Sequence, residues 1–344
     1  MSTLRQEAGR SIEKALLLPS KAKWEAALAL ALGDGVVLVA SHTLAALHIA
    51  VFARRPLLPL LSAARTAQVP CGIGNRLGNK GAVAVSLCVG GTSFLFINCH
   101  LAAHQRRTAQ RNADYHRIES LLPLRPPDGA AAGASGGGGA SGGGGGGGGG
   151  ASGGGGGGGG AGTGASAGAG EVASARFERV FWLGDLNYRV DANRAVVDAL
   201  LAPADERARA APTWRGEEAH WEESRAVLLA NDQLRRQMAE GAAFAGYTEG
   251  EILFRPTYKF DSKVHTEYDH SAKQRIPAYT DRVLYRGGGV ELLRYAACES
   301  LTTSDHRPVT AEFRLHYHPV PAPARTNPAL PAKSGQTSSV CAVM

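Results

Sequence analysis

The stretch Phe181-Trp182-Leu183-Gly184-Asp185-Leu186-Asn187-Tyr188-Arg189 has three apolar residues followed by a glycine and two polar side chains. Such an apolar run is typical of a buried strand. Gly184 ends the strand, so Asp185 and Asn187 are expected on the following turn with their side chains on one side. A carboxylate able to hold a water or a metal ion then lies beside a carboxamide able to hydrogen-bond a phosphoryl oxygen. Taken alone, Gly-Asp-Leu-Asn is also an ordinary strand-to-turn sequence.

The composition limits how much of the 344-residue chain can form a core. Residues 129–170 contain only Gly, Ala, Ser and a single Thr, and such a tract behaves as a flexible coil. A Pro-rich segment follows Tyr317. We therefore predict one domain in two parts, residues 1–128 and 171–317. A disordered insertion at 129–170 interrupts it, and a disordered tail at 318–344 follows it.

Charge and cysteine content narrow the class of protein. The formal charge of +7 suggests an acidic partner, which phosphate esters, nucleic acid or an anionic membrane face would all satisfy. The five cysteines are odd in number and lack close pairs, which argues against a disulfide framework or a zinc site. The sequence contains neither an apolar run long enough to span a membrane nor a secretory signal, so we expect an intracellular protein.

Apolar patterns elsewhere predict both hairpins and helices. Gly90-Gly91 lies between the apolar runs 83–89 and 93–99, which is typical of an antiparallel hairpin. Because strands and helices do not alternate regularly, the fold class should be α+β. The other predicted strands cover residues 36–40, 44–52, 283–285, 290–295 and 309–315, with His42 in a turn. The predicted helices cover residues 12–18, 21–32, 106–122, 191–201 with Asp191 as its cap, and 222–240.

Further polar segments accompany the Gly184–Arg189 turn. They combine carboxylates, imidazoles and cations in a fixed order along the chain. They are Gly78-Asn79-Lys80-Gly81, Asn98-Cys99-His100-Leu101-Ala102-Ala103-His104, Pro256-Thr257-Tyr258-Lys259-Phe260-Asp261, Lys273-Gln274-Arg275-Ile276-Pro277-Ala278-Tyr279-Thr280-Asp281-Arg282-Val283-Leu284 and Ser304-Asp305-His306-Arg307-Pro308-Val309.

In this order and spacing, the segments closely resemble the catalytic domain of the inositol polyphosphate 5-phosphatases, within the magnesium-dependent endonuclease/exonuclease/phosphatase superfamily. The resemblance runs from about Gln6 to Leu315. Gly-Asp-x-Asn and Ser-Asp-His are shared across the superfamily, nucleases included, whereas Tyr188-Arg189, Pro-Thr-Tyr-Lys and Pro-Ala-x-x-Asp-Arg resemble the 5-phosphatases specifically. The resemblance implies a four-layer α/β/β/α sandwich of two mostly antiparallel sheets.

The resemblance also implies roles for individual residues. Glu7 matches a ligand of Mg²⁺, and Asp305 is a second or outer ligand; magnesium prefers a few carboxylate oxygens while keeping its own waters. His306 looks like the catalytic histidine, oriented by Asp281. Asp185 would orient or deprotonate the attacking water. The residues expected to hold the phosphoryl group are Asn187 and His100.

Recognition of a polyphosphorylated ring needs fixed cations as well. By resemblance, Tyr258, Lys259 and Lys273 match positions used against the neighbouring 4-phosphate. Four further residues are expected to bind substrate or shape the site, namely Lys80, His104, Arg189 and Arg275. The implied substrates are phosphoinositide lipids, soluble inositol polyphosphates, or both.

The sequence ends in Cys341-Ala342-Val343-Met344, which fits a prenylation box of the farnesyl type on Cys341. Several 5-phosphatases resemble this chain in carrying such a box. One prenyl chain anchors only marginally without a second signal. We therefore expect a cytoplasmic protein that binds the cytosolic face of membranes peripherally and reversibly.

The sequence departs from the family pattern at its start. Family members begin with a strand ending in Trp-Asn-x-Asn-Gly or a near variant, and nothing before Gln6 supplies it. We expect either a truncated sequence, which is the favoured interpretation, or a protein that lacks this strand and part of its magnesium shell.

Two other functions compete with a 5-phosphatase. A superfamily nuclease would also suit the basic charge, but Lys259 and Lys273 favour a pocket for one neighbouring phosphate over a groove for a nucleic-acid strand, so no nucleic acid is expected. A catalytically impaired phosphoinositide-binding protein is the second alternative, since a missing strand could abolish catalysis and leave binding.

Overall fold

The computed structural model describes residues 2–3, 21–72, 74, 78–126, 171–202, 214–261, 263–318 and 337–343, with only the backbone at 2–3, 214–219 and 337–343. Glu7, the predicted helix at 12–18 and the predicted insertion at 129–170 lie outside these residues.

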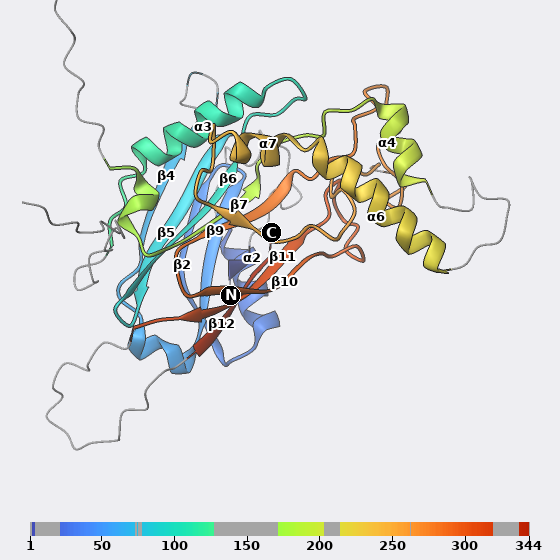
Figure 1. The fold of residues 1–344 in the computed structure, drawn as a ribbon. Helices are drawn as coiled ribbons and strands as arrows, with labels where there is room; N and C mark the ends of the chain where they lie inside the picture. Colours follow the sequence, from blue (N-terminus) through green and yellow to red (C-terminus); the bar gives the residue numbers. More distant parts are fainter. Residues whose placement is uncertain are drawn as a thin grey trace, which may run out of the picture.

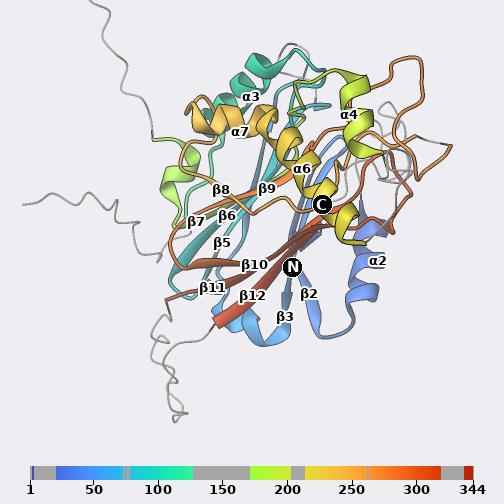
Figure 2. The ribbon, with the colours of Figure 1, turned by 45° about the vertical axis from the view of Figure 1, so that its right-hand side comes forward.

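Two six-stranded sheets make up the body of the protein (Figures 1 and 2). Each contains one parallel pair, β12 with β1 in the first sheet and β6 with β7 in the second, and its other pairs are antiparallel. The first sheet has the order β10 (Val290–Ala297), β11 (Val309–His316), β12 (Thr337–Val343), β1 (Ser2–Thr3), β3 (Leu47–Arg54), β2 (Val36–Leu44). The second has the order β4 (Arg65–Pro70), β5 (Gly81–Val89), β6 (Thr92–His100), β7 (Arg179–Asp185), β9 (Asp281–Arg286), β8 (Thr248–Glu249).

The central strands of the second sheet are buried on both faces. In β7, Phe181 and Leu183 join the core between the two sheets, while Val180 and Trp182 join the core on the opposite face. Strand β6 alternates in the same way, with Phe96 between the sheets. Strands covered on both faces read as nearly continuous apolar runs, which is why the Phe181 stretch stood out in the sequence.

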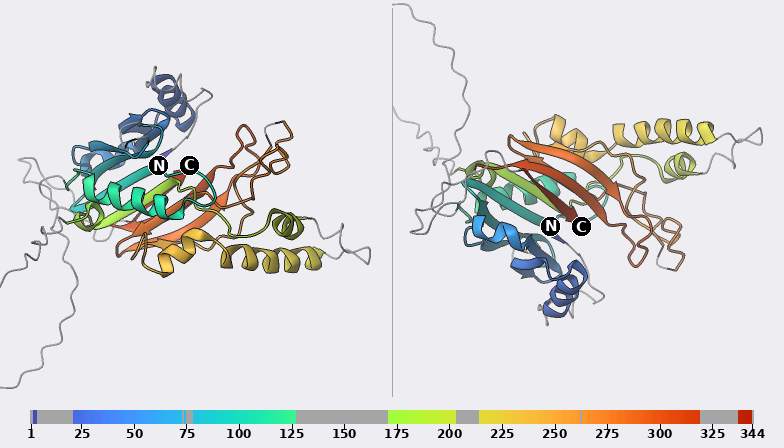
Figure 3. Two further views of the ribbon diagram at one scale, coloured as in Figure 1. Left: turned by 90° about the horizontal axis from the view of Figure 1, so that it is seen from above. Right: turned by 90° about the horizontal axis from the view of Figure 1, so that it is seen from below.

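Helices cover the outer face of the second sheet, as Figures 1 and 3 show for α3 (Thr108–Leu121) and α7 (Gln233–Ala239). Tyr115 and Ile118 of α3 pack in the same core cluster as Trp182. The 3-10 helix η3 (Ala173–Arg176) contacts α3. Helices α4 (Arg194–Leu201) and α6 (Trp214–Ala230) pack on each other and contribute to the core between the sheets. Helix α2 (Ala22–Leu32) contacts β2, and the 3-10 helix η1 (Arg55–Leu60) follows β3.

The predicted fold class, α+β with two mostly antiparallel sheets flanked by helices, is confirmed. The hairpin through Gly90-Gly91 is confirmed in the pairing of β5 with β6, and the helices at 21–32 and 106–122 correspond to α2 and α3. None of the described helices is both long and apolar enough to cross a membrane.

Several local predictions were wrong. His42 lies within β2 and not in a turn, because the β2–β3 hairpin turns at Ala45-Ala46. Helix α4 is capped by Asn193, whose side chain accepts a hydrogen bond from the backbone amide of Ala195. The predicted cap, Asp191, instead accepts hydrogen bonds from the side chains of Gln233 and Arg236 in α7. The single helix predicted at 222–240 is two helices, because Asp232 caps a new one.

Four strands were not predicted, of which β1 and β8 have only two residues each. Strand β4 is short and largely exposed, so its sequence carries little apolar pattern. Strand β12 lies in the segment 318–344 that we expected to be disordered, and its residues 337–343 pair with β11 along their whole length. The predicted tail therefore differs from the structure at residues 337–343.

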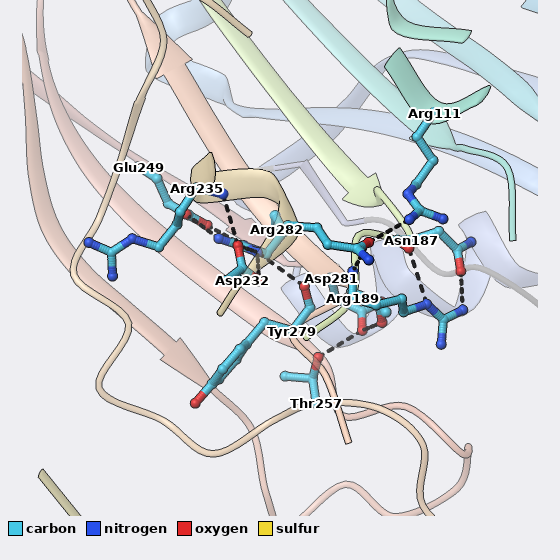
Figure 4. A network of polar contacts seen from close by, with 12 residues as sticks. Arg111, Asn187, Arg189, Asp232, Arg235, Glu249, Thr257, Tyr279, Asp281 and Arg282 are labelled. Atoms are coloured by element: carbon cyan, nitrogen blue, oxygen red, sulfur yellow. Dashed lines mark hydrogen bonds and ion pairs between the residues drawn. The ribbon is translucent and has the colours of Figure 1, made fainter. Parts of the chain in front are cut away.

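A buried charge cluster joins β9 to the elements beside it. Arg282 is fully buried and donates to both carboxylate oxygens of Asp232 at 3.0 Å and to Glu249 at 2.6 Å. Because Asp232 also caps α7 and Glu249 lies on β8, one guanidinium holds three elements together. Figure 4 shows this arrangement.

We predict that Arg282→Met destabilises the protein by roughly 3–5 kcal/mol, because it leaves two buried carboxylates without their cation. The matched control is Arg314→Met, which breaks a pair with Glu291 whose side chains are 45% and 53% exposed and should cost no more than about 1 kcal/mol. Urea unfolding monitored by circular dichroism measures both. Equal losses in the two variants would contradict a stabilising role for the buried cluster.

Candidate active site

The register of three neighbouring strands brings the predicted catalytic residues into one row. Asp185, the last residue of β7, pairs with His100 at the end of the parallel strand β6. On its other side, Asp185 pairs with Asp281 at the start of the antiparallel strand β9. Residues far apart in the sequence therefore meet at a single edge of the sheet.

The turn after β7 depends on its backbone conformation. Gly184 has φ +127°, and a Cβ atom there would lie 2.0 Å from the carbonyl oxygen of Cys99. Only glycine permits this approach of β7 to β6. Asn187 has φ +56°, a left-handed conformation that asparagine adopts more readily than most residues. Together these two positions aim the Asp185 and Asn187 side chains at each other.

Asp185 is buried, and each of its carboxylate oxygens contacts a neighbouring residue. The backbone amide of Asn187 donates to Oδ1 at 2.9 Å, and Asn187 Nδ2 donates to Oδ2 at 3.1 Å. Nε2 of His100 lies 3.2 Å from the same Oδ2. Nδ2 of Asn187 also donates to the Leu101 carbonyl, so both of its hydrogens are used. Asn187, expected to hold the phosphoryl group, is here a partner of Asp185.

His306 and Asp281 form the predicted pair. Nδ1 of His306 lies 2.9 Å from Oδ2 of Asp281. The same oxygen accepts the hydroxyls of Thr257 at 2.9 Å and Thr280 at 3.0 Å. Burial alone would lower the pKa of His306, but the charge and hydrogen bond of Asp281, helped by Asp185, raise it to about 9. His306 is therefore a cation at neutral pH.

His100, in contrast to His306, is a neutral imidazole at neutral pH. Burial, together with the positive charges of Lys80 and His306, lowers its pKa to about 3 against the raising effect of Asp185. Nζ of Lys80 contacts Nε2 of His100, so this predicted substrate residue lies directly beside the row. The site thus pairs a neutral imidazole with a cationic one across two carboxylates.

Tyr258 and Arg189 connect the two halves of the site. The Tyr258 ring lies 4.5 Å from the His306 ring, centroid to centroid, and the Arg189 guanidinium lies 4.5 Å from the centroid of the Tyr258 ring. Arg189 is only 5% exposed and donates to the side-chain and backbone oxygens of Asn187. Both residues, expected to bind substrate, are packed into the framework of the site in this structure.

Lys259 and Asp305 bind each other, with Nζ 2.5 Å from Oδ2. We expected Lys259 to bind substrate and Asp305 to bind metal, so either ligand would have to compete with this ion pair. Among the residues that the structure describes, no group of three or more His, Cys, Asp or Glu side chains could hold a metal ion. The other predicted ligand, Glu7, lies outside the described residues.

The remaining predicted substrate residues lie at the rim. His104 and Lys273 are exposed, and Arg275 is half-buried with its guanidinium 3.5 Å from Asp269. Burial lowers the pKa of His104, and so do the positive charges of Arg107, Arg189, Arg275 and Lys273. Two segments distant in sequence, 104–107 and 273–275, therefore bring cations near one another and near Arg189.

Sequence reasoning missed the two threonines that hold Asp281. Thr257 and Thr280 are both fully buried, and the hydroxyl group of each donates a hydrogen bond to the same carboxylate oxygen of Asp281. Both lie inside the quoted motifs, but no spacing rule links a threonine to an aspartate 24 residues later. Because both segments contain several other polar residues, no local signal distinguished these two threonines.

We predict that the His306–Asp281 pair makes stability depend on pH. The pKa of His306 in the folded protein, about 9, lies above its ordinary value of 6.5. Folding therefore favours the protonated ring, and the stabilisation is complete below about pH 6.5 and is lost as the pH rises through about 9. Urea unfolding between about pH 6 and pH 10 should show this loss for the native chain. Parallel curves for the native chain and Asp281→Asn would contradict the pairing.

Comparison with known proteins supports the sequence resemblance. The family described as Endonuclease/Exonuclease/phosphatase family 2 matches residues 3–312. The chain is 34% identical over 302 residues to phosphatidylinositol polyphosphate 5-phosphatase type IV of Rattus norvegicus, covering 86% of this chain and 39% of that protein. It is 32% identical over 283 residues to synaptojanin of Caenorhabditis elegans, covering 81% of this chain and 20% of that protein. The chain therefore spans well under half the length of these relatives.

A solved structure agrees with both the fold and the resemblance. The inositol polyphosphate 5-phosphatase domain of a synaptojanin, crystallised with inositol (1,4)-bisphosphate and a calcium ion, has a TM-score of 0.61 and 25% identity to this chain. The match covers 95% of this chain and 71% of that one. The predicted resemblance to the inositol polyphosphate 5-phosphatases is thus confirmed, and the chain belongs to the Endonuclease/Exonuclease/phosphatase family 2.

Proposed function

We propose that this chain hydrolyses the 5-phosphate of phosphoinositides, such as phosphatidylinositol 4,5-bisphosphate or 3,4,5-trisphosphate, of soluble inositol polyphosphates, or of both, and that it depends on Mg²⁺. The observation that carries the proposal is the row of His100, Asp185 and Asp281, with His306 bound to Asp281. Relatives named as 5-phosphatases add support.

Hydrolysis of a phosphate monoester needs a positioned water and stabilised charge on the phosphoryl oxygens. Asp185 is the residue we assign to orienting or deprotonating that water, and its carboxylate is kept in place by Asn187 and His100. His306 offers a cationic N–H to a phosphoryl oxygen, since its pKa is about 9. Water attacks directly, and no covalent intermediate on the enzyme forms.

Recognition of the substrate falls to cations around this row. Lys259, beside Tyr258, and the rim residues Lys273, Arg275 and His104 are suited to the phosphates that are not cleaved. Lys259 reaches a neighbouring phosphate by exchanging Asp305 for it. A compact cluster of this kind suits one polyphosphorylated ring, whereas a nucleic-acid strand needs an extended basic groove.

Magnesium would supply Lewis-acid stabilisation of the phosphoryl charge when bound. We assign Glu7 and Asp305 as its protein ligands on the family resemblance. Addition of EDTA should abolish phosphate release and excess Mg²⁺ should restore it. Undiminished activity in EDTA would contradict the metal dependence.

We predict that the full chain releases phosphate from a 5-phosphorylated inositol lipid and that Asp185→Asn lowers kcat by about 10²–10⁴-fold, the usual contribution of a positioned acid or base. Glu291→Gln, an exposed carboxylate on β10, is the matched control and should leave kcat unchanged. Nicking of plasmid DNA without phosphate release would favour the nuclease alternative. Liposome binding with no phosphate release would favour the binding protein.

We also propose that Cys341 is farnesylated and that the protein contacts the cytosolic face of membranes reversibly. Cys341→Ser should then move the protein from the membrane fraction to the cytosol in cells, because one prenyl chain supplies most of a marginal affinity. Cys298→Ser, a described cysteine far from the box in sequence, is the control. Identical fractionation of the Cys341→Ser and native chains would contradict lipidation.

A further inference from the structure

Thr257 donates its hydroxyl to Oδ2 of Asp281 at 2.9 Å, as Figure 4 shows. Thr257 is fully buried, so this hydroxyl has no access to solvent. The Thr280 hydroxyl donates a hydrogen bond to the same oxygen, but Thr280 precedes Asp281 directly in the chain. Of these two hydrogen bonds, the one from Thr257 is therefore the one that joins Asp281 to a separate segment of the chain.

The segment that carries Thr257 is hydrogen-bonded to the segment that contains His306 and to the segment that contains Asp281. The Thr257 carbonyl accepts the amide of Arg307 at 2.8 Å, next to His306. Tyr258 exchanges two backbone hydrogen bonds with Ala278, at 3.2 and 2.7 Å, close to Asp281. Thr257 thus lies where the three segments that build the pair meet.

A carboxylate can rotate about its Cβ–Cγ bond and offer either oxygen, because this torsion is broad. In Asp281, Oδ2 accepts three hydrogen bonds, while Oδ1 lies 3.2 Å from His306 Nδ1. The two hydroxyls fix the plane of the carboxylate, and the carboxylate in turn fixes the imidazole ring and keeps Nδ1 as its donor.

We propose that Thr257 is a positioning residue for the reaction: it acts through Asp281 to hold His306 in its working orientation and does not itself touch the substrate. This inference rests on the proposed phosphatase function. Because Tyr258 and Lys259 follow Thr257 directly, the same short segment carries recognition residues and aligns the catalytic pair.

Two substitutions separate positioning from packing. Thr257→Val keeps the shape and removes the hydroxyl, whereas Thr257→Ser keeps the hydroxyl and removes a methyl group. If Thr257 positions Asp281, Val should lower kcat about tenfold or more with KM within about twofold, and Ser should stay within about twofold of the native chain. If Thr257 served packing alone, the order would be reversed, because serine lacks the buried methyl group that valine keeps.

A double mutant tests the route through Asp281. In the Asp281→Asn background, Thr257→Val should lower kcat by no more than about twofold, since residues acting as one unit are not additive. Additive losses, or a serine variant worse than the valine variant, would overturn the proposal. Thr257→Ala takes the place of Thr257→Val if circular dichroism finds the valine variant unfolded.

A spectroscopic readout keeps this inference separate from the proposed function. The Nδ1 proton of His306, identified by its loss in His306→Gln, should give a downfield NMR resonance in the native chain and in Thr257→Ser. It should shift upfield or disappear in Thr257→Val. An inactive native chain with this pattern would contradict only the phosphatase proposal, whereas an unchanged resonance in Thr257→Val would overturn the positioning role.

Discussion

The pairing of β7 with β6 on one side and β9 on the other is the constraint on which the site depends. It sets His100, Asp185 and Asp281 in one row. A register shift of one residue would turn each of these side chains to the opposite face. Gly184 allows the required approach, because any Cβ there would collide with the backbone of β6. The hydrophobic core on both faces of β7 then holds that register rigidly.

Burying carboxylates is costly unless they are hydrogen-bonded, and the site meets this requirement within itself. Both carboxylate oxygens of Asp185 accept hydrogen bonds from Asn187, and Asp281 is paired with the two threonines and His306. The two imidazoles consequently differ in charge: burial determines the low pKa of His100, whereas at His306 burial is outweighed by the combined effects of Asp281, Asp185 and Asp305, which raise the pKa. A fixed proton distribution is thus built before any substrate binds, which is the condition for preorganised catalysis.

Patterns that depend on neighbours in sequence were predictable, and partners distant in sequence were not. The strand at Phe181 and the hairpin at Gly90-Gly91 follow from local apolar and turn signals. The helix break at Asp232 was missed because local sequence alone permits a helix through Asn231-Asp232. The role of Asp232 depends on Arg282, a partner that is distant in sequence. In the candidate site, the motifs contain segments that the fold brings together. Their local sequence does not indicate that Lys259 pairs with Asp305 or that Asn187 donates its side-chain amide to Asp185.

Strand β12 gives the first sheet an unusual construction, in which a segment near the end of the sequence is hydrogen-bonded on two sides. Ala342 faces Ala311 of β11 and Ser2 of β1, and Cys341 is opposite Glu312. A transferase that recognises a terminal tetrapeptide needs that peptide detached and extended in its own cleft. Cys341 could therefore not receive a lipid while β12 is paired in the sheet. Lipidation would leave the backbone of β11 without this partner, as an edge on which another strand could pair.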